Sequence, residues 1–141
     1  MSMIDYTKFK KSLQQLKLQF ANYQNSAQRS NLSNLDKEAI AESVIQRFET
    51  CYDCVWNHLK RYLIETLGLP NVPNSPKPIF RMAAENQLFI ANTEQWLIYA
   101  DARIQTSHDY DGEKAKIALA LMADFIDDAT ALYQTLSGET C

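Results

Sequence analysis

The most constraining feature of this chain is how rarely its backbone is interrupted. Only 3 glycines and 4 prolines occur in 141 residues, and the prolines all fall between positions 70 and 78. Long uninterrupted segments favour helices over β architectures, which need many tight turns. A chain of this length is also long enough to bury a hydrophobic core. The sequence therefore predicts an all-α fold in a single helical domain that spans residues 1–141.

The first two helical segments are marked by the spacing of apolar residues. Residues 6–23 repeat apolar side chains at steps of three and four, which is typical of one helix face packed on a core. The second segment, residues 35–67, is predicted to begin with Ser33 and Asp36 as a capping pair and to end before Gly68. Its apolar positions cover an arc of about 160°, wider than a surface helix needs. Such an arc indicates either contact with a second subunit or a central helix that touches two neighbours.

The second half of the chain predicts two further segments. One starts near residues 75 and 76, where a serine precedes a proline, and reaches about residue 90. Asn92 and Gln95 can start a helix again that runs to about residue 106, so this stretch forms either one kinked helix or two. The last segment covers residues 111–138. Together these segments predict an antiparallel up-and-down four-helix bundle, with the third helix either continuous or broken into two.

Charge, hydropathy and cysteine content indicate which partners and which cellular compartment to expect for the chain. The net charge is −3, so no global attraction to nucleic acid or to an anionic membrane is expected. No apolar stretch approaches the roughly 20 residues that cross a bilayer, and the first residues lack the apolar core of a signal peptide. An odd count of 3 cysteines argues against a disulfide framework. We therefore expect a cytoplasmic protein with no membrane association.

Several catalytic and metal-binding motifs are absent from the sequence. It contains no Gly-Ser turn followed by two metal-holding aspartates, which nucleotidyl transfer requires, and no glycine-rich phosphate loop. Neither His58 nor His108 has a glutamate three residues before it, as metal sites in helical bundles usually do. Cys51 and Cys54 form a C-x-x-C inside a predicted helix and are interpreted as packing residues, and His58 as structural. No metal or cofactor is expected in this chain itself.

Arg103 is the most unusual side chain in the apolar pattern. On a helical wheel it shares an arc of about 140° with apolar neighbours. These neighbours are Trp96, Tyr99, Ala100 and Ile104. A guanidinium in such a stripe needs a carboxylate, backbone carbonyls or an anionic ligand. Arg103 is therefore either part of an anion-binding site or held by an internal ion pair.

His108 follows Arg103 by five residues, a spacing at which the two side chains meet only if the helix ends between them. In a continuous helix they would diverge by about 140°. A helix that ends near Thr106 would let the following turn bring the imidazole beside the guanidinium, in a compact phosphate-binding or acid–base site. In the structural alternative, Arg103 pairs with Asp109 or Asp111 and the histidine caps the turn.

Residues 103–110, RIQTSHDY, resemble the R-x4-H-x-Y motif of HEPN domains, and more specifically the family of nucleotidyltransferase substrate-binding proteins. The likeness extends over nearly the whole chain. It includes residues 44–49, Trp56, Tyr62–Leu63, Ser75–Lys77, Arg81, Ala84, Trp96–Leu97, Ser107–Asp111 and Lys114–Ala115. Two positions depart from the family: Ile104 stands where Asn is usual, and Asn57 where Lys is usual.

The resemblance implies a homodimer that pairs with a separately encoded minimal nucleotidyltransferase, which would supply the divalent metal and the nucleoside triphosphate. In this chain, Arg103, Ser107, His108 and Tyr110 would contact the nucleotide. Related pairs act as toxin and antitoxin. The alternative is thus a metal-independent ribonuclease that cleaves RNA with Arg103 and His108 and is silenced by nucleotidylation of Tyr110. Ile104 argues against cleavage, since active members carry a polar residue there.

Overall fold

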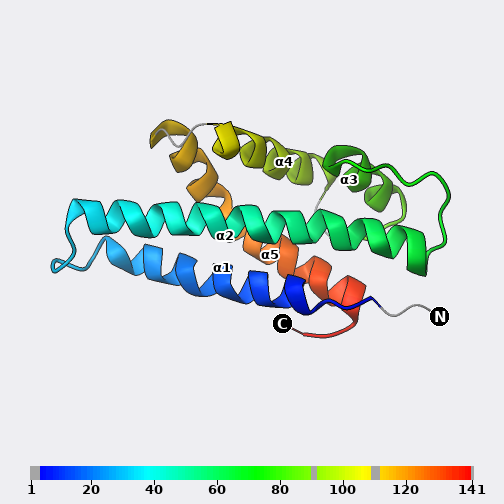
Figure 1. Cartoon of the computed structure of the whole chain (residues 1–141), viewed down its shortest axis with the longest axis horizontal. Helices are drawn as coiled ribbons and strands as arrows, with labels where there is room; N and C mark the ends of the chain where they lie inside the picture. Colours follow the sequence, from blue (N-terminus) through cyan, green and yellow to red (C-terminus); the bar gives the residue numbers. More distant parts are fainter. Residues whose placement is uncertain (1–3, 90–91, 109–111, 141) are drawn as a thin grey trace.

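The computed structural model of the chain describes residues 4–89, 92–108 and 112–140, with the backbone alone described for residues 107 and 108. Within these ranges the regular structure is entirely helical, which confirms the predicted all-α class (Figure 1). A π-helical turn, Tyr62–Thr66, continues the second helix. The α-helices are α1 (Thr7–Ser26), α2 (Asn34–Arg61), α3 (Pro76–Glu85), α4 (Thr93–His108) and α5 (Gly112–Ser137).

Both ends of the long second helix form as their local sequence predicts. The Ser33 hydroxyl accepts a hydrogen bond from the Asp36 N–H, and the Asp36 carboxylate accepts one from the Ser33 N–H, each at 3.1 Å. At the far end, Gly68 has a φ of 64°, a conformation that glycine adopts without strain. Across this glycine the Leu69 N–H donates to the Leu63 carbonyl at 3.0 Å. The capping residues therefore fix where this helical segment begins and ends.

The third predicted segment is two helices, which resolves the question that the sequence left open. Pro76 is the first residue of α3, as predicted, but the helix ends at Glu85, before the expected end near residue 90. It ends there because Gln87 adopts a left-handed φ of 60°. The next helix then begins after Asn92, whose side-chain oxygen accepts a hydrogen bond from the Gln95 N–H at 2.9 Å. This last contact confirms the predicted restart.

Helix α2 lies at the centre of the fold. In Figure 1 the long helices run in alternating directions, with α3 and α4 on one side of α2 and with α5 crossing behind it. The α2 helix contacts α1, α3, α4 and α5, so central packing within one chain accounts for most of its broad apolar arc. Aromatic rings fill the junction, and Phe48 of α2 meets Phe125 of α5 edge to face, with ring centroids 4.9 Å apart. Trp56 remains partly exposed on the outer side of the arc.

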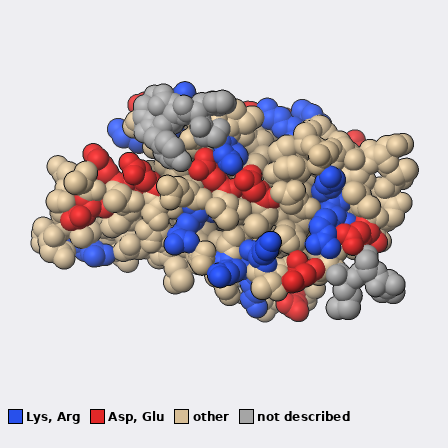
Figure 2. Space-filling model, in the orientation of Figure 1, with Lys and Arg blue, Asp and Glu red and all other residues tan. Residues whose placement is uncertain are grey.

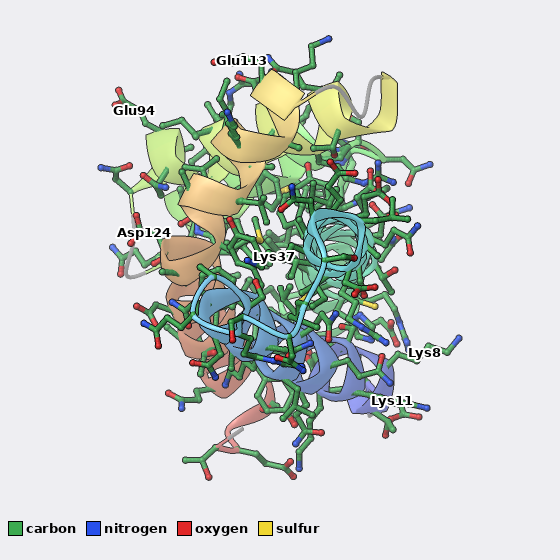
Figure 3. All side chains as sticks on the ribbon, turned by 90° about the vertical axis from the view of Figure 1, so that its left-hand side faces the viewer. Lys8, Lys11, Lys37, Glu94, Glu113 and Asp124 are labelled. Carbon is green, nitrogen blue, oxygen red and sulfur yellow. The ribbon has the colours of Figure 1, made fainter. Side chains whose placement is uncertain are left out.

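The outer faces of the helices carry the charged side chains. Figure 3 shows Lys8, Lys11 and Glu94 projecting away from the packed interior. Among the described helices, none has an apolar stretch long enough to cross a lipid bilayer. On the face drawn in Figure 2, acidic side chains form a band across the left and centre, with basic side chains mostly below it and at the right. The band gives this part of the surface a negative character.

Candidate functional site

The candidate site is built on the face of α4 that turns toward α2. The apolar residues Trp96, Tyr99 and Ala100 are buried on this face, as their spacing predicts, and Arg103 follows on it one turn later. Ile104 departs from the prediction, because its side chain is 50% exposed and lies at the margin of the face. The stripe thus ends in a guanidinium that is partly shielded by protein and that borders on solvent.

Arg103 is held by two carboxylates of α2. Its Nη1 lies 3.0 Å from Oε2 of Glu49, and its Nη2 lies 3.2 Å from Oδ2 of Asp53. The two acids are one helical turn apart, so both can face the same guanidinium. An internal ion pair is one of the alternatives that the sequence left open for Arg103. The predicted partners Asp109 and Asp111 lie outside the described residues.

The two carboxylates hold Arg103 unequally. Oε2 of Glu49 also accepts a hydrogen bond from the buried Thr106 hydroxyl at 3.1 Å, so Glu49 joins α2 to two residues of α4. Its side chain is 14% exposed, compared with 26% for Arg103 and 48% for Asp53. The Nε of Arg103 is buried and finds no acceptor among the described residues. Glu49 is therefore the inner anchor of the guanidinium and Asp53 its outer, water-facing partner.

The local electrostatics favour a permanently charged arginine. Burial alone would lower the pKa of Arg103, but the hydrogen bond and charge of Asp53, together with the charge of Glu49, raise this pKa above its usual value. One cation and two carboxylates leave this cluster with a local excess of one negative charge. A phosphate that approaches Arg103 therefore meets carboxylates already in place.

A hollow of about 510 Å³ opens beside Arg103, between α2, the start of α3 and α4. Its volume is in the range of small-molecule sites. At its edge Lys77 of α3 pairs with Asp101 of α4 at 2.6 Å. Apolar walls next to a guanidinium suit a flat ring attached to a phosphate. The lining residues are Tyr52, Asp53, Trp56, Ser75, Pro76, Lys77, Pro78, Ala100, Arg103 and Ile104.

A larger hollow, of about 830 Å³, lies between the two ends of the chain. Tyr6, Tyr62 and Tyr133 are among its lining residues. It contains none of the residues that the sequence singles out for function. We therefore place the candidate site at the smaller hollow, which contains Arg103.

The remaining motif residues are placed only in part. Helix α4 continues through Ser107 and His108, so the predicted helix end near Thr106 is wrong by about one half-turn. The backbone positions of Arg103 and His108 thus diverge by about 140° around the helix axis. The side chains of Ser107 and His108, and all of Tyr110, lie outside the described residues. The condition that the sequence set for their contact, a helix end between Arg103 and His108, is therefore not met in the described backbone, and the contact itself stays a prediction because the His108 side chain lies outside the described residues.

The cysteines and His58 of α2 make structural contacts. Cys51 is buried in the core, and the Cys54 thiol lies 3.9 Å from the carbonyl of Lys8. The two ring nitrogens of His58 lie 2.7 Å from the Cys54 carbonyl and 3.1 Å from the Asp5 carbonyl. No group of three or more metal-binding side chains occurs in the described ranges. These contacts agree with the packing and structural interpretations of the three residues.

Glu49 and Asp53 are the site residues that sequence reasoning missed. They lie four residues apart, each directly after an aromatic residue of the apolar arc of α2. This spacing places two carboxylates on one edge of the helix, which is a detectable signal. It does not reveal which cation faces them, because Arg103 is 54 residues from Glu49 in the sequence.

Comparisons with known proteins agree with the resemblance found in the sequence. A family described as "nucleotidyltransferase substrate binding protein like" matches residues 4–138. A curated relative, the probable ribonuclease HepT of Haemophilus influenzae, is 30% identical over 102 residues, which cover 71% of this chain and 69% of the relative.

Solved structures share the fold. A Haemophilus influenzae protein, described as a substrate binding domain of a nucleotidyltransferase, superposes with a TM-score of 0.83 and 23% identity, covering 94% of this chain and 98% of that one. A Thermus thermophilus protein gives a TM-score of 0.65 and 25% identity, covering 86% of this chain and 98% of that one. The first likeness, at its low identity, concerns the fold alone.

Proposed function

This chain belongs to the family of nucleotidyltransferase substrate-binding proteins, and from this membership we propose that it is the partner subunit of a separately encoded minimal nucleotidyltransferase. The observation that carries the proposal is the family match over residues 4–138 in a sequence without a nucleotidyltransferase catalytic motif. The partner would contribute the metal-binding aspartates, the divalent metal and the nucleoside triphosphate. This chain would hold the nucleotide or its acceptor.

The hollow beside Arg103 supports a role in holding a nucleotide. Pro76, Pro78 and Ile104 offer apolar surfaces for a base, and the guanidinium of Arg103 offers charge-assisted hydrogen bonds for a phosphate. Ser107, His108 and Tyr110 follow Arg103 in the chain, and in this proposal they complete the contacts to the nucleotide. Tyr110 would also be the acceptor if the partner modifies this chain.

The proposed assembly has further parts. We propose that the helices form an up-and-down four-helix bundle of one domain and that two copies associate through the partly exposed aromatic side of α2 near Trp56. The assembly would act in the cytoplasm as a toxin–antitoxin pair. Trp56→Ala would then lower the dimer content measured by light scattering, whereas Leu18→Ala on exposed α1 surface would leave it unchanged.

Co-purification tests the main proposal. The nucleotidyltransferase encoded beside this chain is expressed with an affinity tag, and the untagged chain is expressed with it. We expect one complex that stays together through size-exclusion chromatography, with a fixed ratio of the two proteins by light scattering. A tagged nucleotidyltransferase of another family serves as the control. Two species that elute separately at micromolar concentrations would contradict the proposal.

A second candidate is a metal-independent ribonuclease, favoured by the 30% identity to the probable ribonuclease HepT. His108 would take the proton of a ribose 2′-hydroxyl, which then attacks the phosphate and expels the 5′-oxygen, leaving a 2′,3′-cyclic phosphate. Arg103 would stabilise the charge that develops on the phosphorus oxygens. Incubation of the purified protein with tRNA in EDTA separates the two functions. Cleavage that His108→Ala abolishes supports the ribonuclease, and intact RNA with both proteins excludes it.

A further inference from the structure

Asp53 and Arg103 both line the hollow of about 510 Å³, whereas Glu49 does not. Asp53 is 48% exposed and makes one contact to the guanidinium, at 3.2 Å from Nη2. A group that enters through the hollow thus reaches the Asp53 side of the guanidinium first. A ligand in the hollow therefore meets the Asp53 carboxylate directly, whereas Glu49 lies on the other side of the guanidinium.

The ion pair between Asp53 and Arg103 is weak. A water-facing ion pair is weak, because solvent competes for both charges. Glu49 is only 14% exposed and also holds Thr106, so the guanidinium keeps its inner anchor when Asp53 moves away. A phosphate oxygen, which is also a negatively charged hydrogen-bond acceptor, can then take the position of the Asp53 oxygen on Nη2.

The displaced Asp53 carboxylate still opposes the binding of a phosphate to Arg103. While Asp53 is ionised, its negative charge lies within a few ångströms of the entering phosphate and opposes its binding. At such a separation, one opposing charge weakens binding by roughly fivefold in bulk water and by much more near a protein surface, so about tenfold is a low expectation for this site. Lys77 also lines the hollow, but its ammonium pairs with Asp101 at 2.6 Å, so Arg103 and Asp53 are the charged groups that an entering phosphate meets beside the guanidinium.

We infer that Asp53 is a built-in competitor for the phosphate that binds Arg103, so that the free chain binds a nucleotide more weakly than Arg103 alone would allow. The inference rests on the proposed function, since it concerns the nucleotide site of that assembly. It assigns to Asp53 an autoinhibitory contact that lowers the affinity of the site for phosphate without blocking it.

Isothermal titration calorimetry of the full chain in EDTA tests this role. The probes are adenosine triphosphate and a short single-stranded RNA with 2′-O-methyl groups, which prevent cleavage, so the two arms separate nucleotide from RNA as the source of the phosphate. Asp53→Asn removes the competing charge and keeps the shape of the side chain. Asp127→Asn, on the exposed side of α5, removes the same net charge elsewhere. The double variant Asp53→Asn with Arg103→Gln removes the phosphate contact, and urea denaturation checks that each variant is folded.

We expect Asp53→Asn to bind at least one of the two probes about tenfold more tightly than the unchanged chain, and Asp127→Asn to differ by less than about twofold. The added Arg103→Gln change should remove the gain. Equal affinities for Asp53→Asn and Asp127→Asn, a gain that survives Arg103→Gln, or no binding by any variant would overturn the inference. These outcomes do not decide whether the chain forms a complex with the nucleotidyltransferase, so the two proposals fail separately.

Discussion

Glu49 and Arg103 join the middle of α2 to the last turns of α4 through an ion pair of 3.0 Å between Oε2 and Nη1. The same glutamate oxygen accepts the hydroxyl of Thr106 at 3.1 Å. One shielded carboxylate therefore determines where the guanidinium lies and how the end of α4 sits on α2. The outer acid, Asp53, adds a second contact that water can replace.

Substitution of the two acids should have unequal effects on stability. We expect Glu49→Gln to lower the free energy of unfolding by about 1–3 kcal/mol, because a shielded guanidinium loses its charged partner. Asp53→Asn should change it by less than about 1 kcal/mol, since its side chain is largely in water. Urea denaturation of both variants at neutral pH measures the difference. Equal losses for the two variants would contradict the distinction between an inner anchor and an outer partner.

Alkaline pH should destabilise the fold through its buried tyrosines. Burial raises the pKa of Tyr6 to about 12. Burial also raises the pKa of Tyr52 and of Tyr99 well above the usual value, with a further rise for Tyr99 from its hydrogen bond to Asp128. In the unfolded chain a tyrosine ionises near pH 10, so as pH rises the unfolded state loses these protons first. The contribution is complete below about pH 10 and declines above it.

Unfolding by urea at a series of pH values measures this decline. We expect the midpoint to stay level up to about pH 9 and to fall between about pH 10 and 12. Tyr99→Phe should make the fall less steep, and at neutral pH it should cost about 1 kcal/mol from the lost hydrogen bond. Phe in place of the partly exposed Tyr23 of α1 is the matched control. A midpoint that is level through pH 12 would show that these hydroxyls ionise as easily in the fold as in the unfolded chain.

The parts of the fold that follow from nearby residues are the parts that the sequence predicts. The capping pair Ser33 and Asp36 and the glycine at 68 are local chemistry, and each lies where the pattern placed it. The partners of Arg103 are distant in the sequence, since Glu49 is 54 residues away in the chain. Helical periodicity indicates that Arg103 needs a carboxylate, backbone carbonyls or an anionic ligand, but which group faces the guanidinium depends on how α2 and α4 pack. Local reasoning could offer only the nearby Asp109 and Asp111 as acidic partners in one of its alternatives, and it ended α4 about two residues before His108.

The ionised carboxylate of Asp128 should slightly lower the free energy of unfolding at neutral pH. Burial raises its pKa, as do the charges of Asp124 and Asp127, and the hydrogen bond from Tyr99 opposes the rise only in part. A raised pKa means that the folded chain prefers the protonated acid, so its contribution to stability is present at acidic pH and is lost as pH rises through that pKa. Asp128→Asn keeps an acceptor for the Tyr99 hydroxyl and removes the charge.

We therefore expect Asp128→Asn to raise the free energy of unfolding at neutral pH by up to about 1 kcal/mol, with the gain vanishing below about pH 3.5. Asp127→Asn, one position away on the exposed side of α5, should gain less. Thermal unfolding at both pH values measures the effect. A loss of stability at neutral pH would mean that the charged hydrogen bond to Tyr99 outweighs the burial of the carboxylate.

Ile104→Asn should reveal whether the residue beside Arg103 limits ribonuclease activity. Ile104 is 50% exposed and lines the hollow, so a polar side chain there costs little core packing and puts an amide next to the guanidinium. The family resemblance makes Asn the usual residue at this position. If cleavage needs that polar group, Ile104→Asn should cut tRNA in EDTA at least about tenfold faster than the unchanged chain, and His108→Ala in the same background should abolish the gain.

The control for added polarity is Ile98→Asn, since Ile98 is a comparably exposed isoleucine on α4. Rates that match between Ile104→Asn and Ile98→Asn would show that the hollow lacks a ribonuclease function that one amide can restore, and would leave the binding role as the better account of Arg103.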